Sequence, residues 1–288
     1  KRGRSLKLQT IYYHKHYLDG PILDRFGTTQ LRHIDEAAIE DWVYDLRKPG
    51  SGEEFSSSVR LSIMDTLLIV LREAHRDKLV NRVPKPERLK RSSRRYDVLT
   101  DDERKALWPA DIEMMTQLWR HNGEGKVTIE EGPALLAATV AFWALSTGMR
   151  SGELRALEPQ HLVRKHSSVL VVQQVDSSGT ITDPKKATEY DPKYRVARVP
   201  ARTWEMLDAY WDVRTECQWL FNLRGQQLRR EWMRQRLVDV MDHLKIDRES
   251  RRLSFHSLRY TYRTMMEQLV DEQMLQRLMG HASVDIGR

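Results

Sequence analysis

Residues 144–157 read ALSTGMRSGELRAL and join two helical stretches through a turn. An apolar run from Ala134 to Leu145 precedes the turn, and Gly148 can adopt the left-handed conformation that ends a helix. Arg150 follows directly, and Glu153 lies three residues later, on the same helical face. The planar guanidinium suits a phosphate or a carboxylate, and Glu153 can orient it. Taken alone, the stretch is better explained by a helix cap with a local Arg–Glu pair.

Two later motifs change the interpretation of this stretch. His256–Arg259 reads HSLR, and Leu278–His281 reads LMGH. Together the three stretches resemble the boxes of the tyrosine recombinases, or phage-integrase-like enzymes, which read T-G-x-R-x-x-E-L, H-x-L-R and L-G-H. Each box is a weak signal alone, but three in this order and at these separations are specific. The resemblance covers residues 97–288 by motif and residues 1–83 by general character.

Length, charge and cysteine content limit the kinds of protein that this sequence can be, independently of the motifs. A length of 288 residues predicts two domains, and a hydrophobic content of 40% is enough to build their cores. The net charge of +7 favours a polyanionic partner, with nucleic acid ahead of an anionic membrane surface. The single cysteine, Cys217, excludes a disulfide within the chain and a Cys-based zinc site, and fits a reducing compartment. Neither a signal peptide nor an apolar run of membrane-spanning length is recognisable.

The first part of the chain, residues 1–83, predicts a small all-helical bundle. Asp35 has the side chain of an N-cap, and the helix after it carries apolar residues at spacings of three and four. Residues 48–55 contain proline and glycine and predict a loop, after which a long helix is expected from Ser57 to Val80. The residues expected to face inward are Ala38, Ile39, Trp42, Val43, Leu46, Val59, Ile63, Leu67, Val70, Leu71 and Ala74.

Residues 84–96 are expected to form a basic linker between two domains. Pro84 and Pro86 end the preceding helix, and only Glu87 opposes the basic residues of this stretch. Such a charge run is often only a solvated connector, but a connector between two domains on DNA would lie along the phosphate backbone. The residues expected to bind DNA here are Lys85, Arg88, Lys90, Arg91, Arg94 and Arg95.

Residues 97–288 predict an α-rich domain with a small antiparallel sheet. Thr100 and Glu103 have the spacing of a capping box at the start of its first helix, which runs through the apolar residues that follow. The β-branched run Val169–Val175 predicts a strand, with Arg195–Val199 as its partner across a long hairpin. Further helices are expected at residues 112–119, 133–145, 201–213, 226–244, 254–270 and 271–279.

The resemblance to tyrosine recombinases implies roles for individual residues. Arg150 and Arg259 would hold the nonbridging oxygens of the scissile phosphate, and His281 would donate a further hydrogen bond. His256 would act as the base for a tyrosine nucleophile. Glu153 would support the site and position Arg150. His256 and Arg259 also lie three residues apart at the expected start of a helix, where free amides favour an anion.

The family also carries a catalytic lysine on its β-hairpin, which would protonate the leaving 5′-oxygen. That lysine usually lies about eight residues before the proline that ends the last strand. Counting back from Pro200 reaches Pro192, so the hairpin is enlarged in this sequence. Lys185 is the first candidate, Lys186 the second and Lys193 the third. A solvated lysine in a turn is the alternative interpretation of each.

The sequence departs from the family pattern in three ways. Met279 stands within the L-G step of the third box, and Tyr260 follows Arg259 where the family often has His or Arg. The family nucleophile is a tyrosine about nine residues after the last histidine, which falls beyond Arg288. We therefore expect the 97–288 catalytic domain to be truncated before its nucleophile. Tyr260 and Tyr262 precede the third box and are not expected to replace it.

The resemblance implies a mainly α fold, with a SAM-like core-binding domain that grips DNA and a larger α-rich catalytic domain. It implies a site-specific recombinase that cuts and rejoins DNA through a 3′-phosphotyrosyl intermediate, without metal or cofactor, for the integration or excision of a mobile element. The implied partners are double-stranded DNA at a specific core site, further copies in a homotetramer on synapsed DNA, and accessory DNA-bending factors, with no membrane. The implied location is cytoplasmic, at the nucleoid in a bacterium.

Several alternatives remain compatible with parts of the sequence. Within the same fold, these are a non-cleaving DNA-binding relative and a recombinase that resolves chromosome dimers. The joint presence of Arg150, His256, Arg259 and His281 argues against a non-cleaving relative. A metal-dependent nuclease or transposase would need ligand motifs, and neither H-E-x-x-H nor cysteine pairs occur. A helical protein–protein scaffold would explain the amphipathic helices but not the three boxes.

Overall fold

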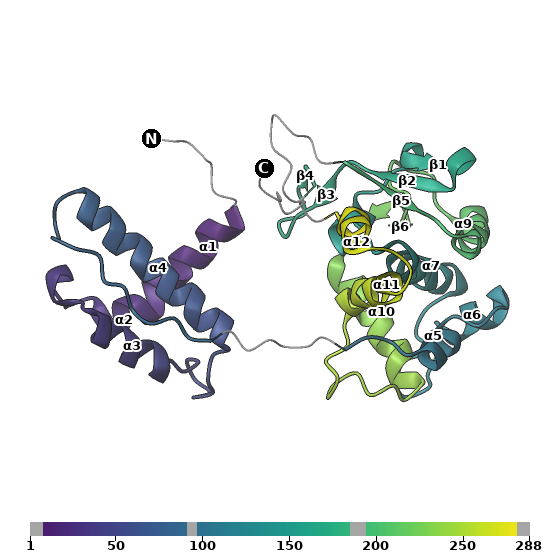
Figure 1. The fold of residues 1–288 in the computed structure, drawn as a ribbon. Coiled ribbons are helices and arrows are strands. Elements are labelled where there is room, and N and C mark those ends of the chain that lie inside the picture. The colour runs from purple at the N-terminus through teal and green to yellow at the C-terminus, as the bar shows by residue number, and fades with distance from the viewer. Residues whose placement is uncertain (1–7, 91–96, 185–193, 281–288) are drawn as a thin grey trace. The chain divides into compact units, whose positions relative to one another are not determined.

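The computed structural model describes residues 8–90, 97–184 and 194–280 (Figure 1). The chain divides into two compact units, Lys1–Arg94 and Arg95–Arg288. Helices dominate the described residues, and the strands form small antiparallel sheets, which confirms the predicted fold class. Within the described ranges, no helix is both long enough and apolar enough to cross a membrane.

The first unit is built from helices. Asp35 caps helix α3 (Glu36–Asp45), as predicted. Its Oδ1 accepts a hydrogen bond from the backbone N–H of Ala38 at 2.9 Å. The long helix ends at Arg76 rather than at Val80, and Lys78 just after it has a positive φ of 63°. Its helical segments are α1 (Leu8–Tyr17), η1 (Leu18–Ile22), α2 (Leu23–Phe26), η2 (Leu31–His33), α3 (Glu36–Asp45) and α4 (Ser57–Arg76).

The core of the first unit lies between α2, α3 and α4. Ile39 and Ile63 are fully buried, and the rings of Phe26 and Trp42 meet edge to face with their centroids 5.0 Å apart. The stretch 84–90, predicted as the start of the linker, packs onto this unit. Its two prolines are buried, and the backbone N–H of Lys85 and of Glu87 donates to carboxylates on α3.

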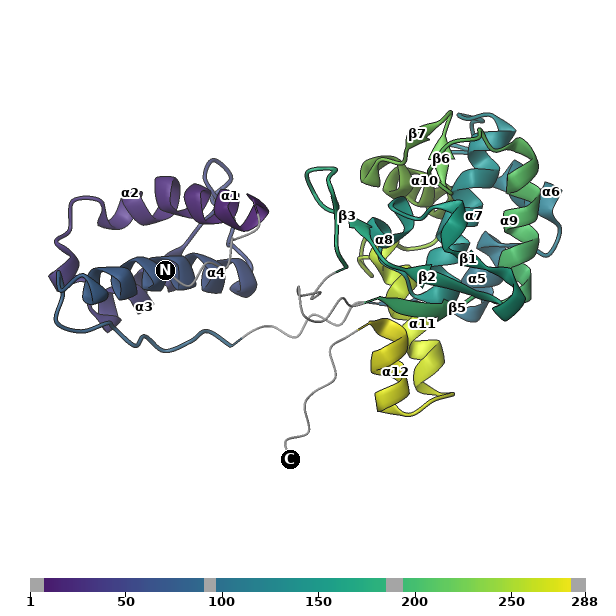
Figure 2. The same ribbon diagram turned by 90° about the horizontal axis from the view of Figure 1, so that it is seen from above.

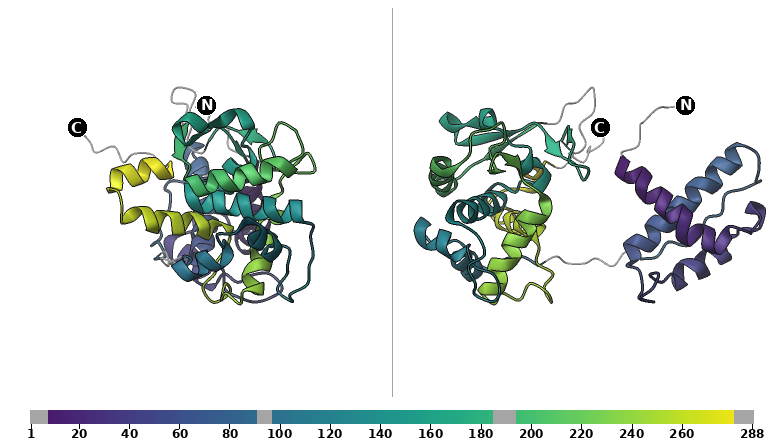
Figure 3. Two further views of the ribbon diagram at one scale, coloured as in Figure 1. Left: turned by 90° about the vertical axis from the view of Figure 1, so that its right-hand side faces the viewer. Right: turned by 180° about the vertical axis from the view of Figure 1, so that it is seen from behind.

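The second unit surrounds one apolar helix. The helices of this unit are α5 (Asp101–Leu107), α6 (Ile112–Leu118), α7 (Glu131–Thr147), α8 (Ser151–Arg155), α9 (Ala201–Val213), α10 (Arg230–His243), α11 (Phe255–Glu267) and α12 (Glu272–Met279). Helix α7 lies between α9 and α11 and also contacts α6 and α10 (Figure 3). It is buried almost all round, and Trp143 on it meets the rings of Phe221 and Trp204 at 5.4 and 5.8 Å. Burial on all sides explains why this helix has no polar face.

In the described part of the second unit, the strands form three small sheets. The strands are β1 (Leu162–Val163), β2 (Ser168–Val171), β3 (Gln174–Val175), β4 (Ile181–Thr182), β5 (Arg195–Arg198), β6 (Asn222–Leu223) and β7 (Gln226–Gln227), with short helical turns η3 (Pro159–His161) and η4 (Arg164–His166) beside β1. The largest sheet has the order β1-β2-β5. Strands β2 and β5 are antiparallel, with Val171 opposite Arg195, so the predicted pairing is confirmed.

Two predicted elements differ in the structure. The strand expected over Val169–Val175 is split into β2 and β3 before Gln174, and at the break the side chain of Gln173 donates to the carbonyl oxygen of Ala156 at 2.8 Å. The helix expected over residues 226–244 begins only at Arg230. Its first residues instead form strand β7, which pairs with β6 across a turn with positive φ at Gly225. Turn chemistry at Gly225 therefore overrides helix propensity there.

Candidate active site

The first box forms the connection between α7 and α8. Helix α7 ends at Gly148, whose φ of +63° is left-handed. A Cβ built on Gly148 would lie 2.4 Å from Cδ1 of Tyr262 on α11. Glycine is thus required twice at this position, for its backbone conformation and for the close approach of α11. The turn places Arg150 at the N-cap of α8, one residue before the helix begins.

We expect Gly148→Ala to lower the free energy of unfolding of the second unit by about 2–5 kcal/mol. A left-handed alanine costs about 1–2 kcal/mol, and overpacking against the Tyr262 ring adds about 1–3 kcal/mol. Gly179→Ala is the matched control, because Gly179 has a φ of +87° but a Cβ added to it would meet nothing within 4 Å. Urea unfolding monitored by tryptophan fluorescence measures both losses. Equal losses in the two variants would contradict the role given to the α11 contact.

Glu153 is the centre of a buried ionic cluster. Its side chain is only 1% exposed. Oε1 accepts a hydrogen bond from Nη1 of Arg150 at 2.8 Å, and Oε2 accepts from the backbone N–H of the same residue at 2.8 Å. Oε2 also accepts from Nη2 of Arg195, at the start of β5, at 2.9 Å. The contact between Glu153 and Arg150 that the spacing predicts is therefore present, and Arg195 joins it.

The ionic cluster keeps Glu153 charged. Burial alone would raise the pKa of this carboxyl, but attraction to Arg195 and then to Arg150 outweighs it, so the pKa lies below its ordinary value of 4.5. Both carboxylate oxygens are engaged by donors on the cluster. The carboxylate therefore holds one arginine from the first box and one from the sheet in fixed positions.

The second box begins helix α11 and places Arg259 inside the site. Arg259 is 3% exposed, and its guanidinium donates from Nη1 to the carbonyl oxygen of Gly148 and from Nη2 to that of Met279. Burial, and then repulsion from Arg150 and Arg195, lowers the pKa of Arg259 to about 9, so the group still carries its charge at neutral pH. Arg259 thus connects the first box to the third.

His256 lies one turn before Arg259 on the same helix but in a different environment. The first turn is closed by Ser254, whose backbone N–H donates to Oγ of Ser257 at 3.0 Å. His256 is exposed, and its ring lies nearly perpendicular to that of Tyr260 with the centroids 4.8 Å apart. The two box residues therefore occupy one helical turn, with the arginine buried and the imidazole open to solvent.

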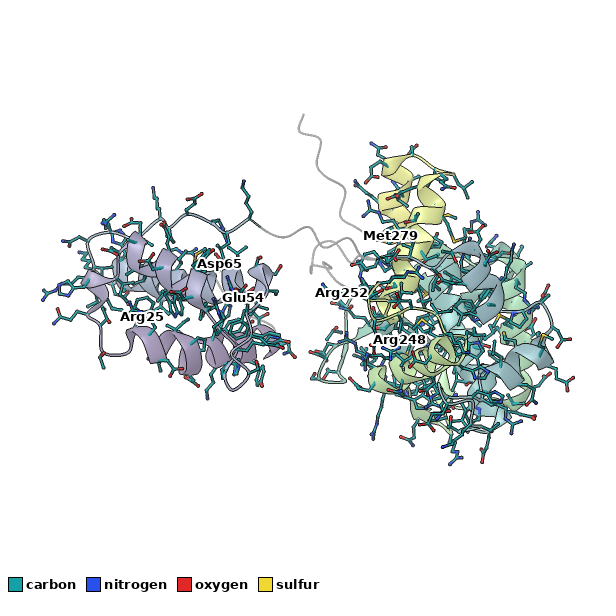
Figure 4. The ribbon with its side chains drawn as sticks, turned by 90° about the horizontal axis from the view of Figure 1, so that it is seen from below. Arg25, Glu54, Asp65, Arg248, Arg252 and Met279 are labelled. Atoms are coloured by element: carbon teal, nitrogen blue, oxygen red, sulfur yellow. The ribbon has the colours of Figure 1, made fainter. Side chains whose placement is uncertain are left out.

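The third box contacts the ionic cluster through the backbone at the end of α12. Helix α12 ends at Gly280, whose φ is +58°, and Figure 4 labels Met279 at this end of the helix. The carbonyl oxygen of Leu278 accepts a hydrogen bond from Nη1 of Arg195 at 2.8 Å. Strand β5 and helices α11 and α12 lie side by side in Figure 2. The three boxes, widely separated in sequence, therefore meet at one place.

Some predicted site residues lie outside the described part of the chain. These are the lysine candidates Lys185, Lys186 and Lys193, the third-box histidine His281, and the basic residues Arg91, Arg94 and Arg95.

The remaining basic residues of the predicted linker can be placed. Lys85, Arg88 and Lys90 are exposed. The guanidinium of Arg88 forms an ion pair with Asp65 on α4 at 2.6 Å, and Asp65 is labelled in Figure 4. The sequence suggested that only Glu87 opposes this charge run, whereas the fold brings Asp65 to it. Lys85 and Lys90 lack such a carboxylate partner among the described residues.

Arg195 is the site residue that sequence reasoning missed. It belongs to none of the three boxes, and the strand prediction placed it only at the beginning of Arg195–Val199. In the fold it lies opposite Val171, whose side chain is buried, and its own side chain is only 11% exposed. Only the fold shows that this arginine reaches Glu153.

The arrangement is suited to an anion rather than to a metal ion. Arg150, Arg195 and Arg259 converge around one carboxylate, which leaves two positive charges in excess among these four groups. Guanidinium groups bind phosphate oxygens through directed pairs of N–H donors. In the described ranges, no group of three His, Cys, Asp or Glu side chains is placed to hold a metal ion.

Comparisons with known proteins agree with this geometry. The phage integrase family matches residues 130–287. The structure is similar to a Tn1549 transposon integrase in complex with transposon right-end DNA, with a TM-score of 0.76 and 15% identity over 96% of this chain and 87% of that chain. It is also similar to a lambda integrase dimer bound to a COC′ core site, with a TM-score of 0.63 and 17% identity over 99% of this chain and 92% of that one.

A third similar structure is the XerH site-specific recombinase bound to a difH substrate, with a TM-score of 0.63 and 16% identity over 97% of this chain and 74% of that chain. At such identities these structures establish the fold. No curated protein sequence matches the chain. The family match spans more than half of the chain and contains the three boxes that meet at Glu153 and Arg259. The chain therefore belongs to the phage integrase family of tyrosine recombinases.

Proposed function

We propose that this protein is a site-specific DNA recombinase that cuts and rejoins DNA through a 3′-phosphotyrosyl intermediate, for the integration or excision of a mobile element. The observation that carries the proposal is the convergence of the three boxes on one buried cluster of arginines around Glu153. The family match and the similar integrases bound to DNA support it, and the transposon integrase among them supports the mobile-element role.

The proposed reaction conserves the phosphodiester energy. A tyrosine oxygen attacks the scissile phosphorus, a phosphorus–oxygen bond to the tyrosine forms, and the bond to the 5′-oxygen of the next nucleotide breaks. The leaving 5′-oxygen takes up a proton. The 5′-hydroxyl of a second strand then attacks the phosphotyrosyl link and releases the tyrosine, so two strands are exchanged without an external energy source.

Arg150 and Arg259 would stabilise the charge that develops on the pentacoordinate phosphate. Arg150 is partly exposed, with 22% of its side chain accessible, and Glu153 holds it in place. Arg259 is oriented by two carbonyl oxygens, one from each of the other boxes. Donors that are fixed before the reaction do not have to reorganise as charge develops, which is why such groups contribute strongly to catalysis.

The other residues of the family pattern complete the proposed mechanism. His256, exposed at the start of α11, would act as the base for the tyrosine. His281 would donate a hydrogen bond to the phosphate. Lys185, with Lys186 as the alternative, would protonate the leaving 5′-oxygen.

DNA binding would use both units of the chain. We assign residues 1–83 to a core-binding domain, residues 84–96 to a basic linker and residues 97–288 to the catalytic domain. Lys85 and Lys90 would contact phosphates, together with Arg91, Arg94 and Arg95. Arg88 would have to exchange its ion pair with Asp65 to do the same. The active assembly would be a homotetramer on two synapsed core sites, with accessory DNA-bending factors as further partners.

The test of this proposal uses the full-length chain, a nicked duplex that carries a candidate core site, and a metal chelator. We expect a covalent protein–DNA adduct on a denaturing gel, and we expect Arg150→Ala to remove it while Arg120→Ala, outside the site, retains it. Tight binding without an adduct would instead identify a non-cleaving DNA-binding relative. Cleavage that requires a divalent metal ion would identify a nuclease or transposase chemistry.

A further inference from the structure

Arg195 makes contacts with two boxes at once. It begins strand β5, and its side chain is only 11% exposed. Nη2 donates to Oε2 of Glu153 in the first box at 2.9 Å, while Nη1 donates to the carbonyl oxygen of Leu278 in the third box at 2.8 Å. One guanidinium therefore connects the carboxylate that holds Arg150 to the end of α12.

The end of α12 is fitted closely around this side chain. A Cβ built on Gly280 would lie 2.7 Å from Cδ of Arg195, 3.0 Å from its Nε and 3.9 Å from Nη1 of Arg150. The left-handed glycine after α12 thus leaves room for Arg195 beside the first-box arginine. This packing and the two hydrogen bonds of Arg195 give its guanidinium one defined position.

We propose that Arg195 is a positioning residue of the phosphate site, a role that rests on the proposed recombinase function. Arg195 engages Oε2 of Glu153 and leaves Oε1 to the side chain of Arg150. Without Arg195, the buried carboxylate would keep Arg150 as its one side-chain partner within the described ranges. Guanidinium and carboxylate groups often form bidentate ion pairs with two parallel hydrogen bonds. In the absence of Arg195, such a pair would turn Arg150 toward Glu153 and away from a phosphate.

The position of Arg195 in the chain gives it a second link to the reaction. It lies at the start of β5, shortly after the sequence segment that contains Lys185 and Lys186. Because Arg195 is bound to both Glu153 and Leu278, the first residue of that strand is held against the first and third boxes. The residue therefore fixes the start of β5 against these two boxes. Its effect should fall on the rate of cleavage more than on DNA affinity.

The decisive variant is Arg195→Gln in the full-length protein. We expect the single-turnover rate constant of adduct formation to fall by about 100-fold, because a shift of about 1 Å in a positioned group costs that much. DNA affinity should stay within about threefold, since the substitution removes no proposed phosphate contact. Arg195→Lys keeps the positive charge but lacks the planar guanidinium with its paired donors, so it should recover part of the rate of adduct formation. Arg198→Gln is the matched control, because Arg198 lies on the same strand, is exposed, and donates to the carbonyl oxygen of His166 at 2.9 Å, away from the cluster.

A chemical substitution in the DNA separates positioning from simple loss of stability. Replacing one nonbridging oxygen of the scissile phosphate with a methyl group makes that phosphate neutral and reduces its need for the arginines. If Arg195 acts by holding Arg150, the defect of Arg195→Gln should shrink by at least about tenfold on the methylphosphonate substrate. A loss of folded protein would lower the rates on both substrates by the same factor.

The outcomes are distinguishable. Two results together support the inference. Arg195→Gln cleaves slowly while the wild type and Arg198→Gln cleave normally, and the defect of Arg195→Gln is smaller on the methylphosphonate. If the wild type forms the adduct and Arg195→Gln forms it at the same rate, this inference is overturned and the proposed function stays intact. An equal defect on both substrates would overturn it too, by reducing Arg195 to a structural residue. Absence of any adduct from the wild type would overturn the proposed function and this inference with it.

Discussion

Replacing Arg259 with alanine is expected to slow covalent adduct formation by roughly 10³-fold or more. Loss of a single fixed donor to a developing oxyanion commonly costs about 10²–10³-fold, and Arg259 would supply a charged group with several donors. The same change removes the hydrogen bonds to Gly148 and Met279 that join the first and third boxes. Single-turnover cleavage of a nicked core-site duplex at saturating protein measures this loss.

The control for Arg259 lies one turn further along α11. Arg263 forms an ion pair with Glu267 at 2.8 Å, and both side chains are 42% exposed. Arg263→Ala should therefore leave the cleavage rate within about twofold, because exposed pairs contribute little. Arg259→Lys retains a positive charge without the planar fork and should cleave faster than Arg259→Ala. Normal cleavage by folded Arg259→Ala would exclude this arginine from the phosphate site.

Glu153→Ala should destabilise the second unit by about 3–5 kcal/mol, because it leaves the largely buried Arg195 and the partly exposed Arg150 without their shared carboxylate. Glu153 is 1% exposed and pairs with both Arg150 and Arg195. The matched control is Glu205→Ala. Glu205 pairs with Arg202 at the same spacing of three residues, but its side chain is 59% exposed, so its loss should cost less than about 1 kcal/mol. Denaturant unfolding gives both values, and similar losses would contradict the buried network.

The same carboxylate predicts a pH dependence. The pKa of Glu153 is lowered in the folded protein, so the unfolded state binds the proton more readily. The stabilisation is then fully present above the ordinary pKa of 4.5 and is lost as the pH falls from that value through the folded pKa. Glu153→Gln should unfold more easily at neutral pH and show a weaker change in stability over this acidic range. An unchanged pH profile would show that Glu153 titrates normally.

Much of the fold could be predicted because local signals and tertiary structure agree. The capping pair Thr100 and Glu103 forms both of its predicted hydrogen bonds, and helix α9 occupies the predicted residues. The left-handed Gly148 ends α7 where the sequence indicated. These features depend on residues close to one another in the chain, so a single sequence contains the information that determines them.

The parts that could not be predicted depend on contacts between distant residues. Arg195 has no local feature that distinguishes it from Arg198 three positions later, yet only the first reaches Glu153. The ion pair of Arg88 with Asp65 likewise forms only after α4 and the following chain are brought together. Spacing located Arg150 and Arg259 through the boxes, but the carbonyl groups that orient Arg259 come from three-dimensional packing.

The most direct measurement of the central claim is the chemistry of the protein–DNA link. Full-length protein is incubated with core-site DNA labelled at the 5′ end of the strand to be cut, with a chelator present, and the adduct is digested and analysed by mass spectrometry. We predict a tyrosine joined to the 3′-phosphate of the labelled fragment, a free 5′-hydroxyl on the other fragment, and retention of the adduct in Tyr260→Phe. A link to a 5′-phosphate, or cleavage to a free 3′-hydroxyl with no covalent protein, would contradict the proposed recombinase mechanism.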